Sequence, residues 1–233
     1  MSNLLNKYKN IVVYFFCFIG MLTITSCKTD FSIDTYTSDF FLNENVDTTA
    51  QVATEIPSCN SENIEEYKSD FLLLFSKDSN AKLIECRQEG FSDYLVAQIT
   101  AEIATKNSDR DIVLFRKPSE TIEIDGVKYD VMGLQPSLHS DFIKRINNLL
   151  EENYETLDYD DMKFKLVLHN DERSNVLVTA HQVWVDGEPK FRYFQESLKR
   201  RDKIILRFNN LVNALIITQE PVVNIFIYRP IKN

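Results

Sequence analysis

The chain contains three histidines, the side chains best suited to acid–base catalysis or metal binding near neutral pH. They are His139, His169 and His181. The turn residues Asn170-Asp171 predict a hairpin that places His169 and His181 about five residue rows apart, which is too far to share a metal ion. The same pattern puts His181 on a half-buried strand face. We therefore expect structural or surface histidines, with metal binding or catalysis as the alternative.

Acidic residues gather in one stretch that could suggest a calcium site: Glu151, Glu152, Glu155, Asp158, Asp160 and Asp161. The stretch lacks the alternating Asp ligands, the central Gly and the distal Glu of an EF-hand loop. It is typical of a solvated helix end and loop. A carboxylate pair for glycoside hydrolysis stays open among the 35 acidic residues, because such a pair is recognised by its geometry.

Motifs of nucleotide binding and nucleophilic catalysis are absent from the sequence. It has no Gly-x-Ser-x-Gly elbow, no P-loop and no Gly-x-Gly-x-x-Gly. Trp184 is expected in the core, with ligand stacking as the alternative. The basic spot Lys199-Arg200-Arg201 is expected at a loop rim, with contact to an acidic partner or a headgroup as the alternative. We predict no catalytic residue, no metal and no cofactor.

The net charge disfavours nucleic acid as a partner. The chain of 233 residues has 26 basic and 35 acidic residues, a formal charge of −9. Residues 1–26 contain two of the basic residues, Lys7 and Lys9, and no acidic one, so the remainder has 24 basic and 35 acidic residues and a charge of −11. Such a surface repels phosphate backbones.

The N-terminus has the layout of a secretory signal. Lys7 and Lys9 provide a positive start, and an uncharged, mostly apolar run extends from Ile11 to Ile24. A run of this length is shorter than the roughly 20 residues that a membrane-spanning helix needs. It matches the hydrophobic part of a cleaved signal peptide.

The stretch Ile24-Thr25-Ser26-Cys27 resembles the lipobox of bacterial lipoproteins, with an aliphatic residue, two small residues and a cysteine. Leucine is commoner than Ile24 at the first position. The resemblance covers about the first 27 residues. It implies cleavage before Cys27, a diacylglyceryl group on the Cys27 sulfur and acylation of the new amino group. Two acyl chains are enough for stable membrane attachment. The alternatives are a plain signal peptide, with Cys27 an ordinary cysteine, and a retained signal anchor.

The resemblance also implies a location in the cell envelope. Lys28 follows the lipidated cysteine where Asp would mark inner-membrane retention in enterobacterial-type cells, so an outer-membrane position is implied in a diderm. Strand-forming residues begin at Phe31, as in small uncharacterised lipoproteins of bacteria and phages. We therefore expect the fold to start close to the membrane, with the face around Phe31 and Tyr36 partly shielded by it. If residues 31–41 are instead disordered, they form the missing tether.

Cys59 and Cys86 are the two cysteines left after Cys17 departs with the signal and Cys27 is lipidated. An even pair in an oxidising compartment favours a disulfide. Two cysteines alone make a poor zinc site. They do not form Cys-x-x-Cys, which argues against a redox role.

Hydrophobic patterns predict a strand-rich chain. Two Asp-Gly pairs, Asp125-Gly126 and Asp186-Gly187, supply the positive φ angles of tight hairpin turns. Helices are expected after Asn60 or Ser61 and after Ser140 or Asp141, and 211–217 fits either a strand or a helix. Strands are expected at 31–37, 51–56, 81–86, 95–103, 112–115, 121–124, 127–131, 163–169, 176–185, 190–194, 203–208 and 222–228.

These observations predict an α+β fold, a mostly antiparallel β-sheet with two or three helices. The expected organisation is a signal peptide at 1–26 and one mature domain at 27–233. The expected function is a membrane-anchored, non-enzymatic binding or structural module, with an envelope protein as a partner. The alternatives are an envelope hydrolase with an unrecognised carboxylate site and a phage or mobile-element surface lipoprotein that blocks infection.

Overall fold

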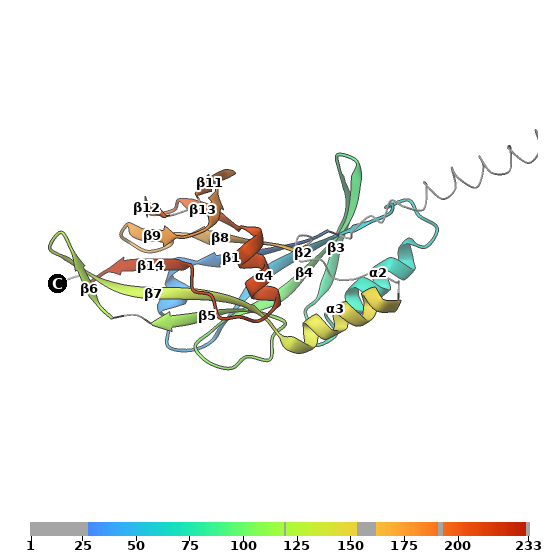
Figure 1. Ribbon diagram of the computed structural model, residues 1–233, viewed down its shortest axis with the longest axis horizontal. Helices are drawn as coiled ribbons and strands as arrows, with labels where there is room; N and C mark the ends of the chain where they lie inside the picture. The colour runs from blue at the N-terminus through green and yellow to red at the C-terminus, as the bar shows by residue number, and fades with distance from the viewer. Residues whose placement is uncertain (1–27, 119, 153–161, 191–192, 232–233) are drawn as a thin grey trace, which may run out of the picture.

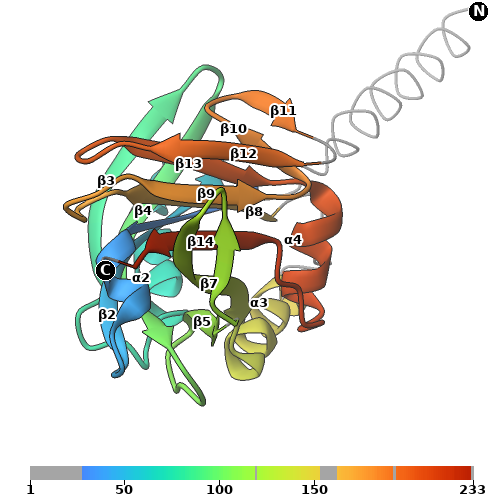
Figure 2. The ribbon, with the colours of Figure 1, turned by 90° about the vertical axis from the view of Figure 1, so that its left-hand side faces the viewer.

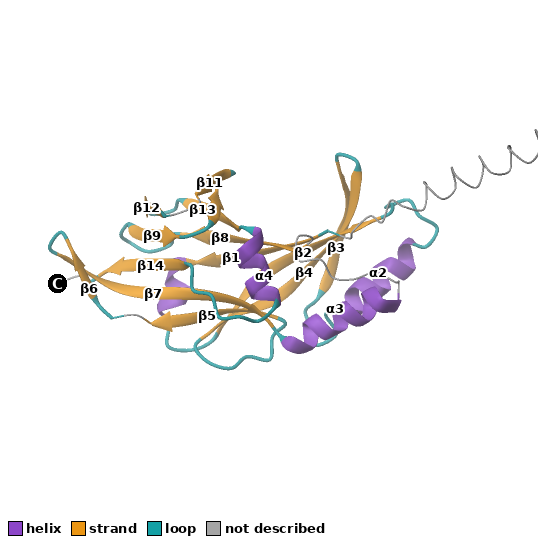
Figure 3. Ribbon diagram, viewed as in Figure 1, coloured by secondary structure: helices purple, strands orange, loops and turns teal. Residues whose placement is uncertain are grey.

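The structure is a computed structural model that describes residues 28–118, 120–152, 162–190 and 193–231. Figures 1 and 3 show strands with a few helices at one end and one side. The helices are η1 (Thr37–Phe41, 3-10), α2 (Ile64–Leu73), α3 (Ser140–Glu152) and α4 (Asn210–Ile217). The strands are β1 (Thr29–Tyr36), β2 (Val46–Ile56), β3 (Lys82–Glu89), β4 (Ser92–Ala104), β5 (Ile112–Pro118), β6 (Ile122–Ile124), β7 (Val127–Leu138), β8 (Met162–His169), β9 (Val176–Ala180), β10 (Val183–Val185), β11 (Glu188–Lys190), β12 (Phe194–Leu198), β13 (Lys203–Phe208) and β14 (Ile225–Pro230).

The described strands form one sheet in the order β11-β10-β13-β8-β1-β2-β4-β5-β7-β14-β9-β12, with β3 added to β4 and β6 added to β7. Its pairings are antiparallel except for β1 with β8 and β4 with β5. The sheet curls until its two ends approach each other, so the end-on view resembles an incomplete barrel (Figure 2). The prediction of an α+β fold is confirmed in part: the described residues form one predominant, mostly antiparallel sheet with three α-helices beside it.

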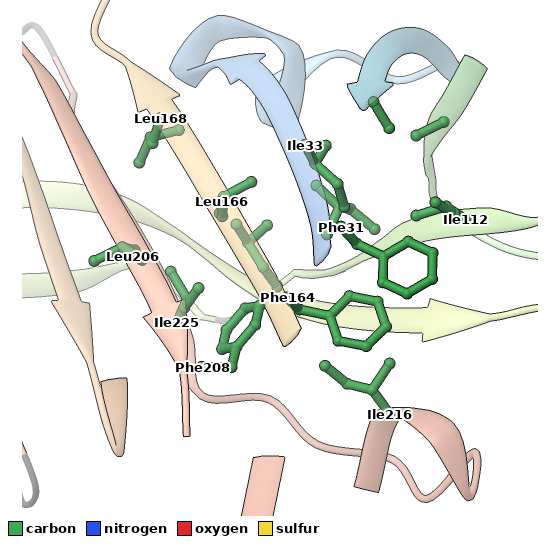
Figure 4. Close-up of a cluster of buried hydrophobic side chains, with 14 of the residues drawn as sticks. Phe31, Ile33, Ile112, Phe164, Leu166, Leu168, Leu206, Phe208, Ile216 and Ile225 are labelled. Carbon is green, nitrogen blue, oxygen red and sulfur yellow. The ribbon is translucent and has the colours of Figure 1, made fainter. Parts of the chain in front are cut away.

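Along each strand, alternate side chains point to the inner face of the curled sheet and form the core. In β1, Phe31 and Ile33 are buried while Asp30 and Asp34 are exposed. Phe31 stacks on Phe164 of β8 with ring centroids 4.6 Å apart, and α4 contributes Ile216 to the same cluster (Figure 4). The period of two therefore sorts each strand into an inner apolar row and an outer polar row.

Both predicted Asp-Gly hairpins are present. Asp125 and Gly126 have φ angles of 52° and 78° between β6 and β7. Asp186 and Gly187 have φ angles of 47° and 91° between β10 and β11. Positive φ at both central residues is the type I′ geometry that matches the twist of paired strands.

The predicted hairpin around Asn170-Asp171 is wrong. Each strand has two edges, and those of β8 are occupied by β1 and β13, so β9 pairs with β12 and β14 instead. The loop between β8 and β9 is held by the buried Asn170 side chain, whose amide donates to the carbonyls of Ser174 and Leu198. Side-chain hydrogen bonding of Asn170 thus replaces the expected tight turn.

Other expectations need smaller corrections. Helix α2 begins at Ile64 after Asn63, without a side-chain cap, rather than after Asn60 or Ser61. Helix α3 begins at Ser140 itself, slightly earlier than a cap at Ser140 or Asp141 would place it, and the His139 ring accepts the hydrogen bond of the Asp141 amide. The ambiguous segment 211–217 is helical, because the Asn209 side chain accepts a hydrogen bond from the Val212 amide and caps α4.

Arg116 of β5 is buried with 1% of its surface exposed. Its guanidinium donates to the carbonyl oxygens of Asp39, Leu42 and Glu44. Burial lowers the pKa of Arg116, and the nearby charge of Asp39 opposes that shift. Arg116 therefore fastens η1 and the loop after it to the sheet.

No helix in the described part of the chain is long and apolar enough to cross a membrane.

Candidate functional site

A cleft of about 440 Å³ opens beside the first residues of β1. We call it the Trp184 cleft. Its lining comes from β1, β8, β13, the β10–β11 hairpin and the start of α4: Asp30, Phe31, Ser32, Lys163, Phe164, Lys165, Trp184, Gly187, Arg207, Phe208 and Asn210.

Strand register places the polar lining residues in one row across the outer face of the sheet. Trp184 of β10 lies opposite Arg207 of β13, and Arg207 lies opposite Lys165 of β8. Lys165 in turn lies opposite Ser32 of β1. Because cross-strand neighbours on one face are about 5 Å apart, these side chains share one surface.

Positive charge predominates in the Trp184 cleft. Lys163, Lys165 and Arg207 line it together with the Asp30 carboxylate, and the Glu89 carboxylate lies close enough to affect the pKa of Lys165. Among the described residues, the ion pairs within 4 Å involve none of the four lining side chains. In a chain with net negative charge, such a local excess of cations is an attractive site for an anion.

Desolvation by the walls of the Trp184 cleft shifts the pKa values of two of its residues, Lys165 and Asp30. Burial lowers the pKa of Lys165, and the like charge of Arg207 adds to that shift. Asp30 keeps an exposed surface, but desolvation by the neighbouring cleft walls raises the pKa of its carboxyl group, against the opposing effect of Lys163, Arg207 and Lys165. A partly desolvated cation such as Lys165 gains more from an anionic ligand than a fully hydrated one does.

Two hairpins rise on the same side of the sheet, the β10–β11 hairpin and the β3–β4 hairpin, and both views show them above β1 and β8 (Figures 1 and 2). The turn of the β3–β4 hairpin contains Gly90 and Phe91. Phe91 has 108% of its reference surface exposed, more than any other large hydrophobic side chain described. Glu89 of β3 contributes to the pKa shift of Asp30, so this hairpin lies near the cleft.

Trp184 is not a core residue, contrary to the prediction. It is 40% exposed because it stands on the outer face, between the buried Val183 and Val185. Its position in the cleft is compatible with the alternative expected from the sequence, which is contact with a ligand.

The three histidines lie apart from the cleft and serve local structure. The His139 ring accepts a hydrogen bond from the Asp141 amide at the start of α3. His169 Nε2 lies 2.9 Å from the Asp34 carboxylate. His181 is exposed rather than half-buried, because the positive φ of Gln182 interrupts the strand, and its ring centroid lies 5.3 Å from that of Tyr193.

The hairpin between β8 and β9 is absent, so the predicted positions of His169 and His181 within it are wrong as well. His169 lies opposite Tyr36 of β1 and Lys203 of β13. No group of three His, Cys, Asp or Glu side chains in the described part of the chain is arranged to hold a metal ion. The acidic stretch is mostly at 153–161, outside the described residues.

Cys59 and Cys86 form a disulfide, with the sulfur atoms 1.99 Å apart. It joins the segment after β2 to β3, as expected from the cysteine count. The Cys59 amide also donates to the Asp93 carboxylate at 2.7 Å. The half of the β3–β4 hairpin next to its turn is therefore fixed covalently and by a hydrogen bond.

The range from the first strand to the last strand matches the model of a known protein family. Residues 29–230 match the family described as Domain of unknown function (DUF7424). The chain belongs to the DUF7424 family. The DUF7424 match begins with the first residue of β1 and ends with the last residue of β14, so the curled sheet is the family's domain. No curated protein and no solved structure matches the chain.

The lipobox residues, Cys27 included, lie outside the described residues, and the structure begins with Lys28. One expectation about the start of the DUF7424 domain is wrong. Phe31 is fully buried and Tyr36 is 49% exposed at the other end of β1, so they do not share a surface. The part of the domain nearest Cys27 is the start of β1 at Thr29.

Proposed function

We propose that the protein is a lipid-anchored lipoprotein of the cell envelope that acts as a non-enzymatic binding module through the Trp184 cleft. One observation carries the proposal: β1 begins at Thr29, two residues after Cys27, and the cleft opens at this same end. Two extended residues span at most about 7 Å. A lipid on Cys27 would hold the cleft close to the membrane surface.

The chemistry of the cleft supports binding over hydrolysis. Its lining includes the carboxylate of Asp30 but no second carboxylate and no histidine. A carboxylate-based glycosidase needs two acidic groups across the scissile bond. Cations beside an exposed indole instead suit the retention of an anionic group next to an apolar or planar one.

The anchor is tested by replacing Cys27 with alanine and labelling cells with a palmitate analogue. We expect the C27A protein to lose the label and to leave the membrane fraction or remain uncleaved. Cys17→Ala is the matched control, because Cys17 lies in the leader but outside the lipobox. A C27A protein that still carries label and still fractionates with membranes would contradict the proposal.

A further inference from the structure

We propose that the Trp184 cleft binds the phosphate of an anionic phospholipid headgroup in the membrane that carries the anchor, and that Phe91 enters the same bilayer surface. This inference rests on the proposed anchoring through Cys27. It adds the ligand class of the cleft and the orientation of the domain.

The position of the hairpins relative to the anchor is the first argument. Thr29 lies opposite Thr54 of β2, and Thr54 lies opposite Leu95 of β4. Phe91 is four residues before Leu95, which corresponds to about 13 Å along a strand and about 10 Å across two strand spacings. The hairpin tip and the lipid on Cys27 are therefore close enough to reach one bilayer surface together.

The exposure of Phe91 is the second argument. A phenylalanine at the tip of a hairpin gains nothing from water, and its burial in an apolar phase is worth about as much as that of a core side chain. Aromatic side chains are favoured where a bilayer meets water. Trp184, across the cleft, adds an amphipathic indole, which is suited to the headgroup level.

Charge is the third argument. A domain with a net charge of −11 is repelled by an anionic leaflet unless a locally positive surface faces it. The cleft supplies that surface with Lys163, Lys165 and Arg207, none of which has an ion pair within the described part of the chain. Phosphate oxygens are strong acceptors for lysine and arginine. A phospholipid headgroup offers this anion at the place where the anchor holds the cleft.

Trp184 is the only tryptophan in the chain, so its fluorescence reports on the cleft directly. The mature, lipidated protein is placed in vesicles of phosphatidylcholine, with or without phosphatidylglycerol, and acrylamide quenching of Trp184 is measured. We expect Trp184 to be shielded only in vesicles that contain phosphatidylglycerol. Equal quenching on both vesicles, with the protein retained on both, would overturn the inference and leave the anchor intact. A protein that both vesicles fail to retain would instead refute the anchoring.

Variants with matched controls test each contact. Each basic side chain near an anionic surface contributes roughly fivefold to binding, so Lys163→Gln with Arg207→Gln should lower the ratio of docked to free domain about twenty-five-fold. Lys106→Gln with Lys128→Gln, two exposed cations outside the cleft, should leave the ratio unchanged. An equal loss in both pairs would indicate a general charge effect and would overturn a specific cleft.

Phe91→Ser should reduce docking, while Val127→Ser should not. Val127 is 41% exposed at the turn of the β6–β7 hairpin, which lies at the far end of the domain (Figure 1). Both side chains are exposed, so both variants should unfold at unchanged urea concentration. A Phe91→Ser protein that docks like the parent would refute insertion of the tip.

Inorganic phosphate distinguishes a headgroup from a soluble anion. It is titrated onto the protein in neutral vesicles while Trp184 quenching is monitored. If phosphate shields Trp184 and phosphatidylglycerol does not, the cleft serves a soluble ligand and the headgroup assignment is refuted. If phosphate only competes with phosphatidylglycerol at high concentration, the assignment stands.

Discussion

Replacing Arg116 by methionine should lower the free energy of unfolding by about 3 kcal/mol. The guanidinium donates to three backbone carbonyls of the segment Asp39–Glu44 and is buried. A hydrogen bond from a charged donor contributes about 1.5–3 kcal/mol. Three such bonds exceed the cost of burying the charge, which is several kcal/mol and is visible in the lowered pKa of Arg116. Methionine fills similar volume but leaves the carbonyls without this donor.

Urea unfolding monitored by Trp184 fluorescence and far-UV circular dichroism measures the effect. With a denaturant slope of about 2 kcal/mol per M, the midpoint should fall by about 1.5 M. Lys68→Met is the control, because Lys68 forms a partly exposed ion pair with Glu65 at 2.7 Å and such pairs contribute less than about 1 kcal/mol. Equal midpoints for the two variants would refute the view that Arg116 fastens η1 to the sheet.

Three further outcomes are expected from the structure. Replacing Cys59 and Cys86 by alanine should cost about 3–4 kcal/mol in the same urea assay, because the disulfide closes a loop with a sequence separation of 27; an unchanged midpoint would show that the bridge does not restrict the unfolded chain. Asp30→Asn should raise stability at pH 7, because the raised pKa of Asp30 means that ionisation disfavours the fold. The gain should shrink as the pH falls through the raised pKa and should be absent below about 4, where Asp30 is protonated in both states; a gain that is constant with pH would contradict this cause. A long Gly/Ser linker inserted after Lys28 should leave the urea midpoint unchanged but reduce shielding of Trp184 on anionic vesicles, because the effective concentration of the cleft at the membrane falls; full shielding with the linker would show that proximity is not required.

Local patterns in the sequence predicted the elements well where one physical signal was sufficient. The alternation from Leu95 to Ile103 corresponds to β4, and the Ile-Ile-Leu run corresponds to β13 at Lys203–Phe208. The Asp-Gly pairs predicted both type I′ turns, since few other residues adopt those φ angles. The cysteine pair was predictable because only two cysteines remain outside the N-terminal segment that has the pattern of an export signal.

Pairings between distant strands were not predictable from the same patterns. Nothing local shows that β8 is already flanked by β1 and β13, so Asn170-Asp171 was misinterpreted as a hairpin turn. The Trp184 cleft depends on that register. Lys163 and Lys165 alternate with buried residues in a way that indicates an outward face, but their proximity to Arg207 and Trp184 comes from three separate strands. Sequence could have found the cations, though not the cleft that they share.

The parallel pairing of β1 with β8 has a consequence for how the chain folds. Thr29 pairs with Met162, so the first strand can complete its pairing only with a segment that lies more than 130 residues later in the chain. If the chain is exported, it emerges N-terminus first, and pairings between such distant segments form slowly. Until β8 arrives, β1 has an open edge, and an open edge can pair with another copy of the same strand. If β1 is anchored to a membrane beside its first residue, neighbouring unfinished chains are confined to one surface. Their spacing on that surface then determines whether β1 meets its own β8 or the β1 of another molecule.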